Sequence, residues 1–363
     1  MQAISIRYGA SVWQAAQSTG LPAAPAAGAL AAAPWGGQPR WQPRQDASLQ
    51  TLRGVSMGTG WSLRLVNTDF RPLAQAQQLV EQTLAQVVAE MSHWAHDSML
   101  TEWNRAPAGS TLCLPQALAQ VIDAAAHWHA ASGGAYDPSL GALVQVWGFG
   151  PRAQPQMPHP GSVPSPAAIA WARQHSGWHR VQWDAQSATL WQPGGVQLDL
   201  SGIAKGFAVD WVAQRLQQAG WAHGLLEIGG ELKAWGHRPD GQAWHAGLSL
   251  GEAQAPLPIP LHDGGALATS GDCWHGFEHD GVRYSHTIDP RTGWPVPNPL
   301  RSVTVWHAQC MHADALATVL TVLGAEAAWE FAVRHEVAAV LQPPGAHPAQ
   351  RTPAWHARFG EKG

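Results

Sequence analysis

The sequence predicts an α+β fold, with a mixed, largely antiparallel sheet on which helices pack. Stretches typical of strands and of helices follow one another without the regular alternation that produces a parallel sheet. Glycine-rich turns join neighbouring strand-like stretches, as in antiparallel hairpins. The chain has 363 residues, of which 45% are hydrophobic. It is therefore long and apolar enough to bury a large core.

The chain divides into three parts by composition. Residues 1–50 are rich in Ala, Pro and Gly, and we expect a low-complexity, disordered leader there. Residues 51–342 carry the patterns of ordered structure and are expected to form a single domain. Residues 343–363 are Pro-rich, and we expect an irregular tail.

The first half of the domain begins with strands and continues with helices. The stretch LQTLRGVSMGTGWSLRLV predicts two strands around the turn MGTG. Apolar residues at 79, 80, 84, 87, 88 and 91 then recur with a helical period. A second helix is predicted in PQALAQVIDAAAHWHAASGG, where Gly133 and Gly134 end it. RVQWDAQSATLWQ alternates like a hairpin.

The second half mixes the two types of element again. We predict a helix from Ile203 to Gln218, followed by strands in HGLLEIGGELKAWG and AWHAGLSL. Residues 265–305 are expected to be mostly strand and loop. Helices over 313–323 and 325–335 and a strand in VAAVLQP complete the order.

Composition excludes several classes of function. Charged residues are 13% of the chain and the net charge is −4, so there is no basic footprint for nucleic acid or an anionic membrane. No apolar run reaches the ~18 residues of a transmembrane helix. The three cysteines, Cys113, Cys273 and Cys310, lack metal-ligand spacing. The start shows neither an export signal nor a lipid-anchor cysteine, which favours a cytoplasmic location; a different true start would allow a periplasmic one.

One helix carries a lone carboxylate. From Ala313 to Ala325 the only charged residue is Asp314, and Thr318 lies one turn later on the same face. An unpaired buried carboxylate is costly and needs a donor or a cation. A carboxylate and a hydroxyl together suit a hard cation such as Mg²⁺. The alternative is that Asp314 caps a neighbouring helix or pairs with an arginine.

A second candidate site lies in LDLSGIAKGFAVD, read as strand, turn and helix. Amides at the start of a helix favour an anion such as phosphate. Lys205 lies in the first turn, where the helix dipole disfavours a cation, and a bound phosphate would explain its placement. The alternative is an ordinary exposed lysine.

Two further stretches are rich in turn residues. ALATSGDCWHGFEHDGVRYSHTIDPRTGWPV contains His286, a candidate general base, although the chain has 19 histidines. GGAYDPSLGALVQVWGFGP combines a turn, an aspartate and an apolar run. Either stretch would equally suit a set of tight turns packed on the core.

Together these motifs resemble the ApbE family of flavin transferases. The matching segments occur in family order between residues 50 and 342: MGTGW, MSHWAHDSMLTEWN, GGAYDPSLGALVQVWGFGP, LDLSGIAKGFAVD, EIGGELKAWG, ATSGD, YSHTIDPRTGWPV and ADALATVLTVLG. The resemblance implies a single α+β domain with a central FAD cleft. It also implies Mg²⁺-dependent transfer of the FMN part of FAD to a Thr or Ser hydroxyl of an acceptor protein, such as an electron-transport subunit or flavin reductase, with release of AMP.

The resemblance also assigns roles to individual residues. It implies that Asp314 and Thr318 bind the metal through their side chains and Gly202 through its carbonyl. It makes His286 the general base. The implied FAD contacts are Met57, Trp94, Ala135, Tyr136, Asp137, Asp199, Lys205 and Ile288. Trp94 stands where relatives often have Tyr, and its ring would stack on a base or flavin; packing on the core is its alternative role.

Two other activities use the same residues. A hydrolase would split FAD into FMN and AMP with water as the acceptor. A non-catalytic FAD-binding protein is the third possibility, against which the Asp314–Thr318 pair argues. The sequence does not identify the acceptor.

Overall fold

The computed structural model describes residues 4–5, 48–151, 161–250, 256–262, 264–271, 276–297, 300–345 and 347–360. Most of the predicted leader and Cys273 lie outside these ranges. The α+β prediction is confirmed: an eight-stranded sheet has the order β18-β17-β16-β11-β8-β7-β3-β2, and every pairing in it is antiparallel.

The large sheet is built from segments spread over the chain. Its strands, from one edge to the other, are β18 (Gln350–Arg351), β17 (Ala338–Gln342), β16 (Ser302–His307), β11 (Ala266–Ser270), β8 (Glu231–Trp235), β7 (Gly224–Ile228), β3 (Thr59–Val66) and β2 (Leu49–Ser56). The predicted strand pair around MGTG is the hairpin β2–β3, which pairs from Leu49↔Val66 to Ser56↔Thr59.

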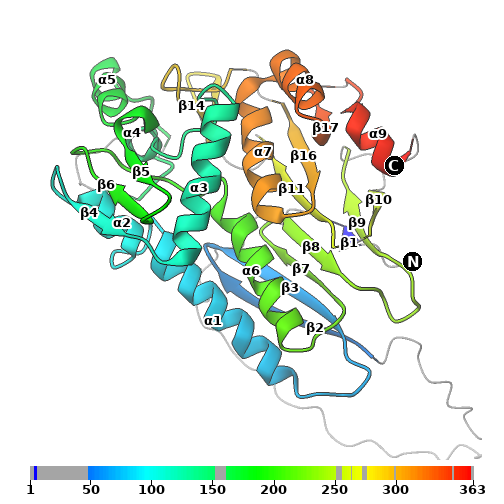
Figure 1. The fold of residues 1–363 in the computed structure, drawn as a ribbon. Coiled ribbons are helices and arrows are strands. Elements are labelled where there is room, and N and C mark those ends of the chain that lie inside the picture. Colours follow the sequence, from blue (N-terminus) through cyan, green and yellow to red (C-terminus); the bar gives the residue numbers. More distant parts are fainter. Residues whose placement is uncertain are drawn as a thin grey trace, which may run out of the picture.

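Helices cover one face of this sheet (Figure 1). They are α1 (Leu73–Met91), α3 (Gln116–Ala131), α6 (Ala204–Gln218), α7 (Cys310–Leu323) and α8 (Ala325–Arg334). Their apolar faces share one core with the strands. In α1 the buried residues are spaced three and four apart, at Ala76, Val80, Leu84 and Val87, which is the pattern that predicted the helix.

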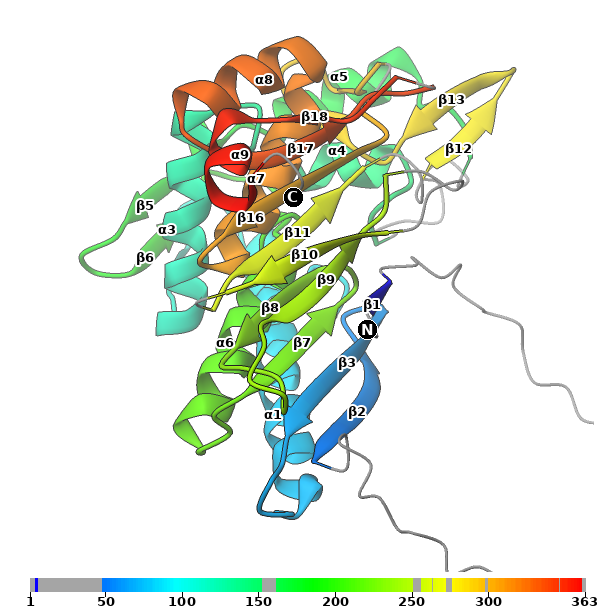
Figure 2. The ribbon, with the colours of Figure 1, turned by 90° about the vertical axis from the view of Figure 1, so that its right-hand side faces the viewer.

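The opposite face of the sheet carries a second, smaller layer (Figure 2). It contains β1 (Ile4–Ser5), β9 (Trp244–Leu248) and β10 (Leu257–Leu261), in the order β1-β9-β10. Helix α9 (Pro353–Phe359) joins it through the buried Trp355. Residues 347–360, for which the sequence predicts an irregular course, thus carry β18 and α9. Thr352 begins α9 by accepting a hydrogen bond from the Trp355 amide.

Shorter elements complete the molecule at one end. They are α2 (Met99–Arg105), α4 (Gly141–Val146), α5 (Pro166–Gln174) and the 3-10 helix η1 (Trp178–Arg180). The strands are β4 (Thr111–Cys113), β5 (Gln182–Asp184), β6 (Thr189–Trp191), β12 (Gly276–His279), β13 (Val282–Ser285), β14 (Ile288–Asp289) and β15 (Trp294–Pro295). The predicted hairpin in 180–192 is β5–β6. Among the described helices, none is long and apolar enough to cross a membrane.

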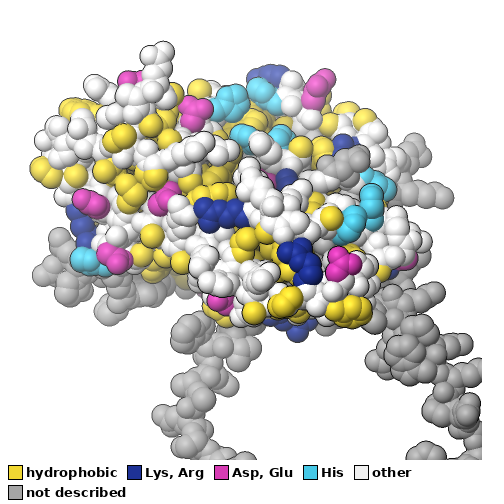
Figure 3. Space-filling view, turned by 60° about the horizontal axis from the view of Figure 1, so that its bottom comes forward, with side chains coloured by type: hydrophobic (Ala, Val, Ile, Leu, Met, Phe, Trp, Pro, Cys, Tyr) yellow, Lys and Arg dark blue, Asp and Glu magenta, His cyan; other side chains and the backbone are white. Residues whose placement is uncertain are grey.

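The surface carries no continuous basic region on the face that Figure 3 shows. Lys and Arg side chains lie there in separate small groups, with Asp and Glu side chains between them. This distribution agrees with the net charge of −4.

Candidate functional site

Helices α6 and α7 meet at the centre of the candidate site. A Cβ added to Gly206 would lie 2.4 Å from the Cys310 carbonyl oxygen and 2.8 Å from the Asp314 Cβ, so only glycine allows this approach. The Gly206 amide donates to Asp314 Oδ2 at 3.0 Å. Asp314 therefore caps the start of α6 with one oxygen, as the alternative interpretation of the sequence expected.

The second oxygen of Asp314 and the hydroxyl of Thr318 remain available for another partner. Among the described residues, no hydrogen bond to Asp314 Oδ1 or from Thr318 Oγ1 is found, whereas Thr83 and Thr321 both donate to the carbonyl four residues earlier in their helices, at 2.7 Å. A Cβ on Gly202 would lie 2.9 Å from Thr318 Oγ1. The turn at Gly202 thus lies directly against the Thr318 hydroxyl, one helical turn from Asp314.

Glu231 adds a carboxylate that the sequence did not single out. It begins β8, directly after the Gly229–Gly230 turn, is 2% exposed, and accepts a hydrogen bond from Lys205 Nζ through Oε1. Its Oε2 is buried without a partner among the described residues. Lys205 is therefore held in a partly buried ion pair, and it is not the freely exposed lysine that the alternative interpretation proposed.

The electrostatics of the site leave an excess of negative charge. Burial raises the pKa of Glu231 to about 7, Lys205 opposes the rise, and Asp314 adds to it. Burial also raises the pKa of Asp314, against the effects of Lys205 and the Gly206 amide. Two buried carboxylates thus share one ammonium, and a divalent cation would stabilise both in their charged forms.

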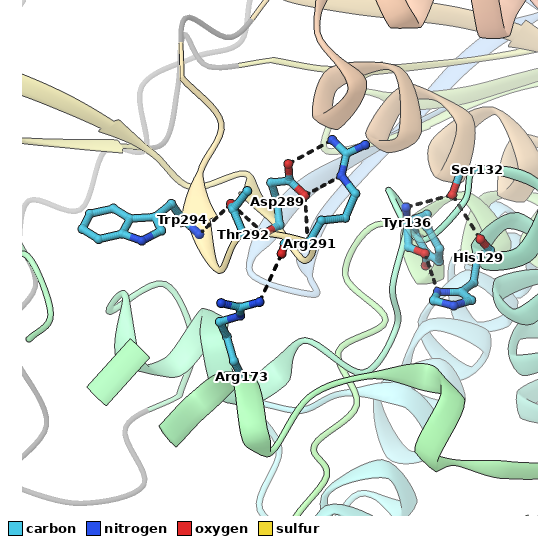
Figure 4. A network of polar contacts seen from close by, with 8 residues as sticks. All are labelled: His129, Ser132, Tyr136, Arg173, Asp289, Arg291, Thr292 and Trp294. Atoms are coloured by element: carbon cyan, nitrogen blue, oxygen red, sulfur yellow. Dashed lines mark hydrogen bonds and ion pairs between the residues drawn. The ribbon is translucent and has the colours of Figure 1, made fainter. Parts of the chain in front are cut away.

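The loop of Ala135, Tyr136 and Asp137 lies near Asp314 and Asp199. Tyr136 is 4% exposed; burial raises the pKa of its hydroxyl, and Asp314, Asp199 and Asp137 raise it further. Its backbone is held by Ser132 Oγ and His129 Nδ1, both at 3.0 Å (Figure 4). Ala135 packs with Val296 and Val322, which places the loop beside the C-terminal half of α7.

The turn after Asp199 offers fewer donors to an anion than the sequence predicts. Asp199 Oδ1 accepts from the Ser201 amide at 2.8 Å. The amides of Ile203 and Ala204 donate to the Leu200 carbonyl, at 3.1 and 2.8 Å, and that of Gly206 donates to Asp314. Any phosphate here would depend chiefly on Lys205 and a metal.

His286 lies on the segment that connects β13 to β14, and Ile288 begins β14. Ile288 is 3% exposed and packs against α4 and α5, so its side chain is a core residue. The ring of His286 lies 6.3 Å from that of Phe149. Val296 donates to the Thr287 carbonyl at 3.0 Å, and through Val296 this segment joins the Ala135 loop.

The hairpin β14–β15 that follows is tightly fixed. Arg291 contacts Asp289 through two bonds of 2.9 Å, and Arg173 of α5 donates to the Arg291 carbonyl (Figure 4). The buried Trp147 donates from Nε1 to the Gly293 carbonyl at 2.9 Å. These contacts hold the backbone on the C-terminal side of His286.

Met57 is half-buried and packs against the main core, whereas Trp94 lies at the surface. Met57 and Gly58 both have positive φ, 51° and 72°, as the two central residues of a type I′ hairpin turn do. Trp94 is 63% exposed, so it does not pack in the core. Its neighbour His93 places Nδ1 3.5 Å from Asp199 Oδ1, and this connects the Trp94 loop to the rest of the site.

Direct contacts thus link several of the predicted site residues. Among the residues that the structure describes, however, no group of three or more His, Cys, Asp or Glu side chains could hold a metal. A site here would depend on Asp314, a hydroxyl and a backbone carbonyl. Sequence reasoning missed Glu231 and His93. The two acids on either side of a Gly-Gly turn, in EIGGE, were the available signal for Glu231.

Comparison with known proteins places these residues in a family. Residues 57–341 match the model of the ApbE family. The chain is 33% identical over 296 residues to the FAD:protein FMN transferase of Vibrio cholerae, covering 80% of this chain and 86% of that one. With the Haemophilus influenzae protein of the same name it shares 33% over 309 residues, 82% and 87% of the two chains.

Solved structures are similar to the whole fold. The apo form of the flavinyl transferase ApbE from Pseudomonas stutzeri has a TM-score of 0.78 at 34% identity and covers 86% of this chain and 97% of that one. The ApbE protein from Thermotoga maritima has a TM-score of 0.77 at 26% identity, with 86% and 99% covered.

Proposed function

The chain belongs to the ApbE family, and on this basis we propose that it is a FAD:protein FMN transferase. The observation that carries the proposal is the match over residues 57–341, together with relatives of that name over 80% of the chain. FAD is the substrate that donates the flavin, and a protein is the acceptor.

The reaction proposed for the acceptor is a phosphoryl transfer. A Ser or Thr hydroxyl of the acceptor protein attacks the phosphorus on the FMN side of the FAD pyrophosphate. A new phosphoester bond forms, the P–O bond to AMP breaks, and AMP leaves with the electron pair. The hydroxyl loses its proton in the same step. Positioning and charge neutralisation provide most of the catalysis in such transfers.

The oxygen set at Asp314 fits a hard divalent cation, and we propose Mg²⁺. Asp314 Oδ1, Thr318 Oγ1 and the carbonyl of Gly202 would hold it. When bound, the ion would neutralise negative charge on the pyrophosphate. Lys205 would add positive charge beside it, and the exposed ring of Trp94 would stack on a ring of FAD.

The proposed base is His286. In its neutral form the imidazole would accept the proton of the acceptor hydroxyl. The neighbouring contacts of Thr287 and of the β14–β15 hairpin hold its backbone in place, which favours a fixed position for the ring.

The decisive experiment combines the chain with FAD, Mg²⁺ and an acceptor domain that carries a flavinylation-type Ser or Thr motif. Intact mass of the acceptor and the nucleotide products are measured together. A gain of one FMN with release of AMP is expected. Free FMN and AMP without a modified acceptor would indicate the hydrolase, and FAD binding without products the non-catalytic protein.

Asp314→Asn tests the metal site. The amide keeps an acceptor for the Gly206 N–H but loses the charge, so we expect flavin transfer to fall at least ~100-fold, and EDTA to do the same to the wild type. Asp280→Asn is the control, because that side chain is 92% exposed. Equal loss in both variants, or full activity of Asp314→Asn, would contradict the assignment.

His286→Ala tests the base. Removal of a general base lowers the rate by roughly 10²–10⁴, while FAD binding, followed by flavin fluorescence, should change little. If His286→Ala transferred flavin at the wild-type rate, another group would have to accept the proton.

A further inference from the structure

Residues 196–200 form a buried segment that leads into the Gly202 turn and lies outside the strands described above. Val196, Leu198 and Leu200 are fully buried and Asp199 is 7% exposed. Buried backbone groups need hydrogen-bond partners. On one side the loop before α4 provides them: the Asp199 amide donates to the Pro138 carbonyl at 2.7 Å, and the Gly141 amide donates to the Gln197 carbonyl at 2.9 Å.

Elsewhere along the segment, side chains take the place of a neighbouring strand, and Asn104 is the one that pairs with Leu198. Asn104 Nδ2 donates to the Leu198 carbonyl at 2.9 Å, and Asn104 Oδ1 accepts from the Leu198 amide at 2.7 Å. The carboxamide thus pairs with both polar groups of the residue that directly precedes Asp199. Asn104 lies in the last turn of α2, 94 residues away along the chain.

The other end of α2 holds the loop that carries Trp94. Ser98 caps the helix by accepting from the Thr101 amide at 3.0 Å, and its hydroxyl donates to the Ser92 carbonyl. Ser92 Oγ in turn accepts from the amides of Trp94 and Ala95, both at 3.1 Å. Helix α2 therefore connects the exposed Trp94 loop to the buried segment before Gly202.

We propose that Asn104 is a positioning residue for the metal turn. It does not touch substrate or metal; it fixes Leu198, and so sets where Asp199 and the Gly202 carbonyl stand relative to Thr318 and Asp314. The close approach of Gly202 to Thr318 leaves little tolerance for a shift of the turn. This inference rests on the part of the proposed function that places a metal at Asp314 and Thr318. It does not depend on which molecule accepts the flavin.

The test measures metal binding directly, without FAD or acceptor. Mn²⁺ is titrated into the full chain, and the free ion is measured by electron paramagnetic resonance. Asn104→Ala removes both bonds to Leu198, and we expect Mn²⁺ to bind at least fivefold more weakly. Asn104→Asp keeps the acceptor and replaces the donor with an oxygen that faces the Leu198 carbonyl, so a loss of at least threefold is expected.

Gln192 provides a matched control. Its amide is fully buried and joins the same helix to the same segment, by donating to the carbonyls of Trp103 and Val196 at 2.9 and 3.1 Å. Val196 lies two residues further from the turn than Leu198. We expect Gln192→Ala to lower the melting temperature about as much as Asn104→Ala while changing Mn²⁺ affinity less than twofold.

The outcomes separate the positioning role from general stability. Unchanged Mn²⁺ affinity in the Asn104 variants would overturn the inference, as would an equal loss in Gln192→Ala. If Asn104→Ala does not fold, the comparison of Asn104→Asp with Gln192→Ala decides. A wild-type chain that binds no Mn²⁺ would overturn the metal site and this inference together; one that binds Mn²⁺ but transfers no flavin would overturn the proposed activity alone.

In the transfer reaction the same variants give a second readout. A misplaced turn weakens Mg²⁺ binding, so the Mg²⁺ concentration for half-maximal rate should rise at least fivefold in Asn104→Ala. Saturating Mg²⁺ fills the weakened site by mass action and should restore part of the lost transfer rate. The maximal rate should fall less than the rate at low Mg²⁺. An equal fall at all Mg²⁺ concentrations would contradict the assigned role.

Discussion

Glu231 and Asp314 show how single residues set the charge of the site. Both carboxylates are almost fully buried, and Lys205 is the ammonium that lowers the pKa of each. A buried carboxylate without full compensation prefers to hold its proton. In the absence of a cation the site therefore binds protons more readily than an exposed pair of acids would.

This preference predicts a pH dependence of stability. Burial raises the pKa of Glu231 from 4.5 to about 7, so between these values the folded chain holds a proton that the unfolded chain releases. The free energy of unfolding of the metal-free protein should therefore fall by about 1–3 kcal/mol as pH rises from 4.5 to 7. Denaturant unfolding in EDTA at pH 5 and pH 7 measures it. In Glu231→Gln the free energy of unfolding should no longer fall in this way with pH. An equally steep fall in that variant would show that Glu231 is not the group responsible.

At the residue scale, the sequence predicted what depends on local pattern. Asp314 stood out because it is a lone charge in an apolar helix. The bond between Asn104 and Leu198 could not be predicted, because the two residues are 94 positions apart and neither has an unusual local context. The same holds for His93, whose position beside Asp199 depends on how the Trp94 loop folds back.

At the scale of elements, the contact between α6 and α7 determines the site. Besides the Gly206–Asp314 bond, Asp210 of α6 accepts from the Met311 amide at 2.9 Å and pairs with Lys233 of β8 at 2.9 Å. Periodicity predicted both helices nearly to their observed ends, since Ala204–Gln218 and Cys310–Leu323 differ from the expected ranges by three residues at most. Their close approach was not predictable, because it depends on which glycine faces which carbonyl.

Gly206→Ala should separate the two helices. The added Cβ would meet backbone at 2.4 Å, and overpacking of this kind costs about 1–3 kcal/mol, more than the ~1 kcal/mol gained in helix propensity. We expect a net loss of stability in denaturant unfolding and weaker Mn²⁺ binding. Gly60→Ala is the control, because its nearest neighbour would lie at 3.9 Å. A Gly206→Ala chain as stable as the wild type would show that α6 and α7 can shift apart freely.

At the scale of the whole molecule, the two faces of the large sheet have separate cores. The helical face was predictable from apolar periodicity. The other face was not, since α9 is only seven residues long and follows a Pro-rich stretch that the sequence indicates to be irregular. Helix α9 is held in place by Trp355, because the ring of Trp355 fills the core between α9 and the sheet.

Two tryptophans test this division. Trp355 is fully buried, so Trp355→Ala should cost about 3–5 kcal/mol of unfolding free energy. Trp94 is 63% exposed, so Trp94→Ala should change stability by less than about 0.5 kcal/mol while weakening FAD binding. Denaturant unfolding and flavin fluorescence measure the two effects. A large stability loss in Trp94→Ala, or none in Trp355→Ala, would contradict the assigned packing.

Strand β2 has a consequence for self-association. It forms one edge of the eight-stranded sheet, so among the described residues no further strand pairs with its outer row of peptide groups. Such a row is the usual starting point of aggregation. Arg53 stands exposed on this strand. Burial lowers the pKa of Arg64 on the adjacent strand, and the charges of Arg53 and Arg238 lower it further. A second copy adding in register would bring these like charges together. We expect the repulsion between these arginines to oppose edge-to-edge pairing of two copies.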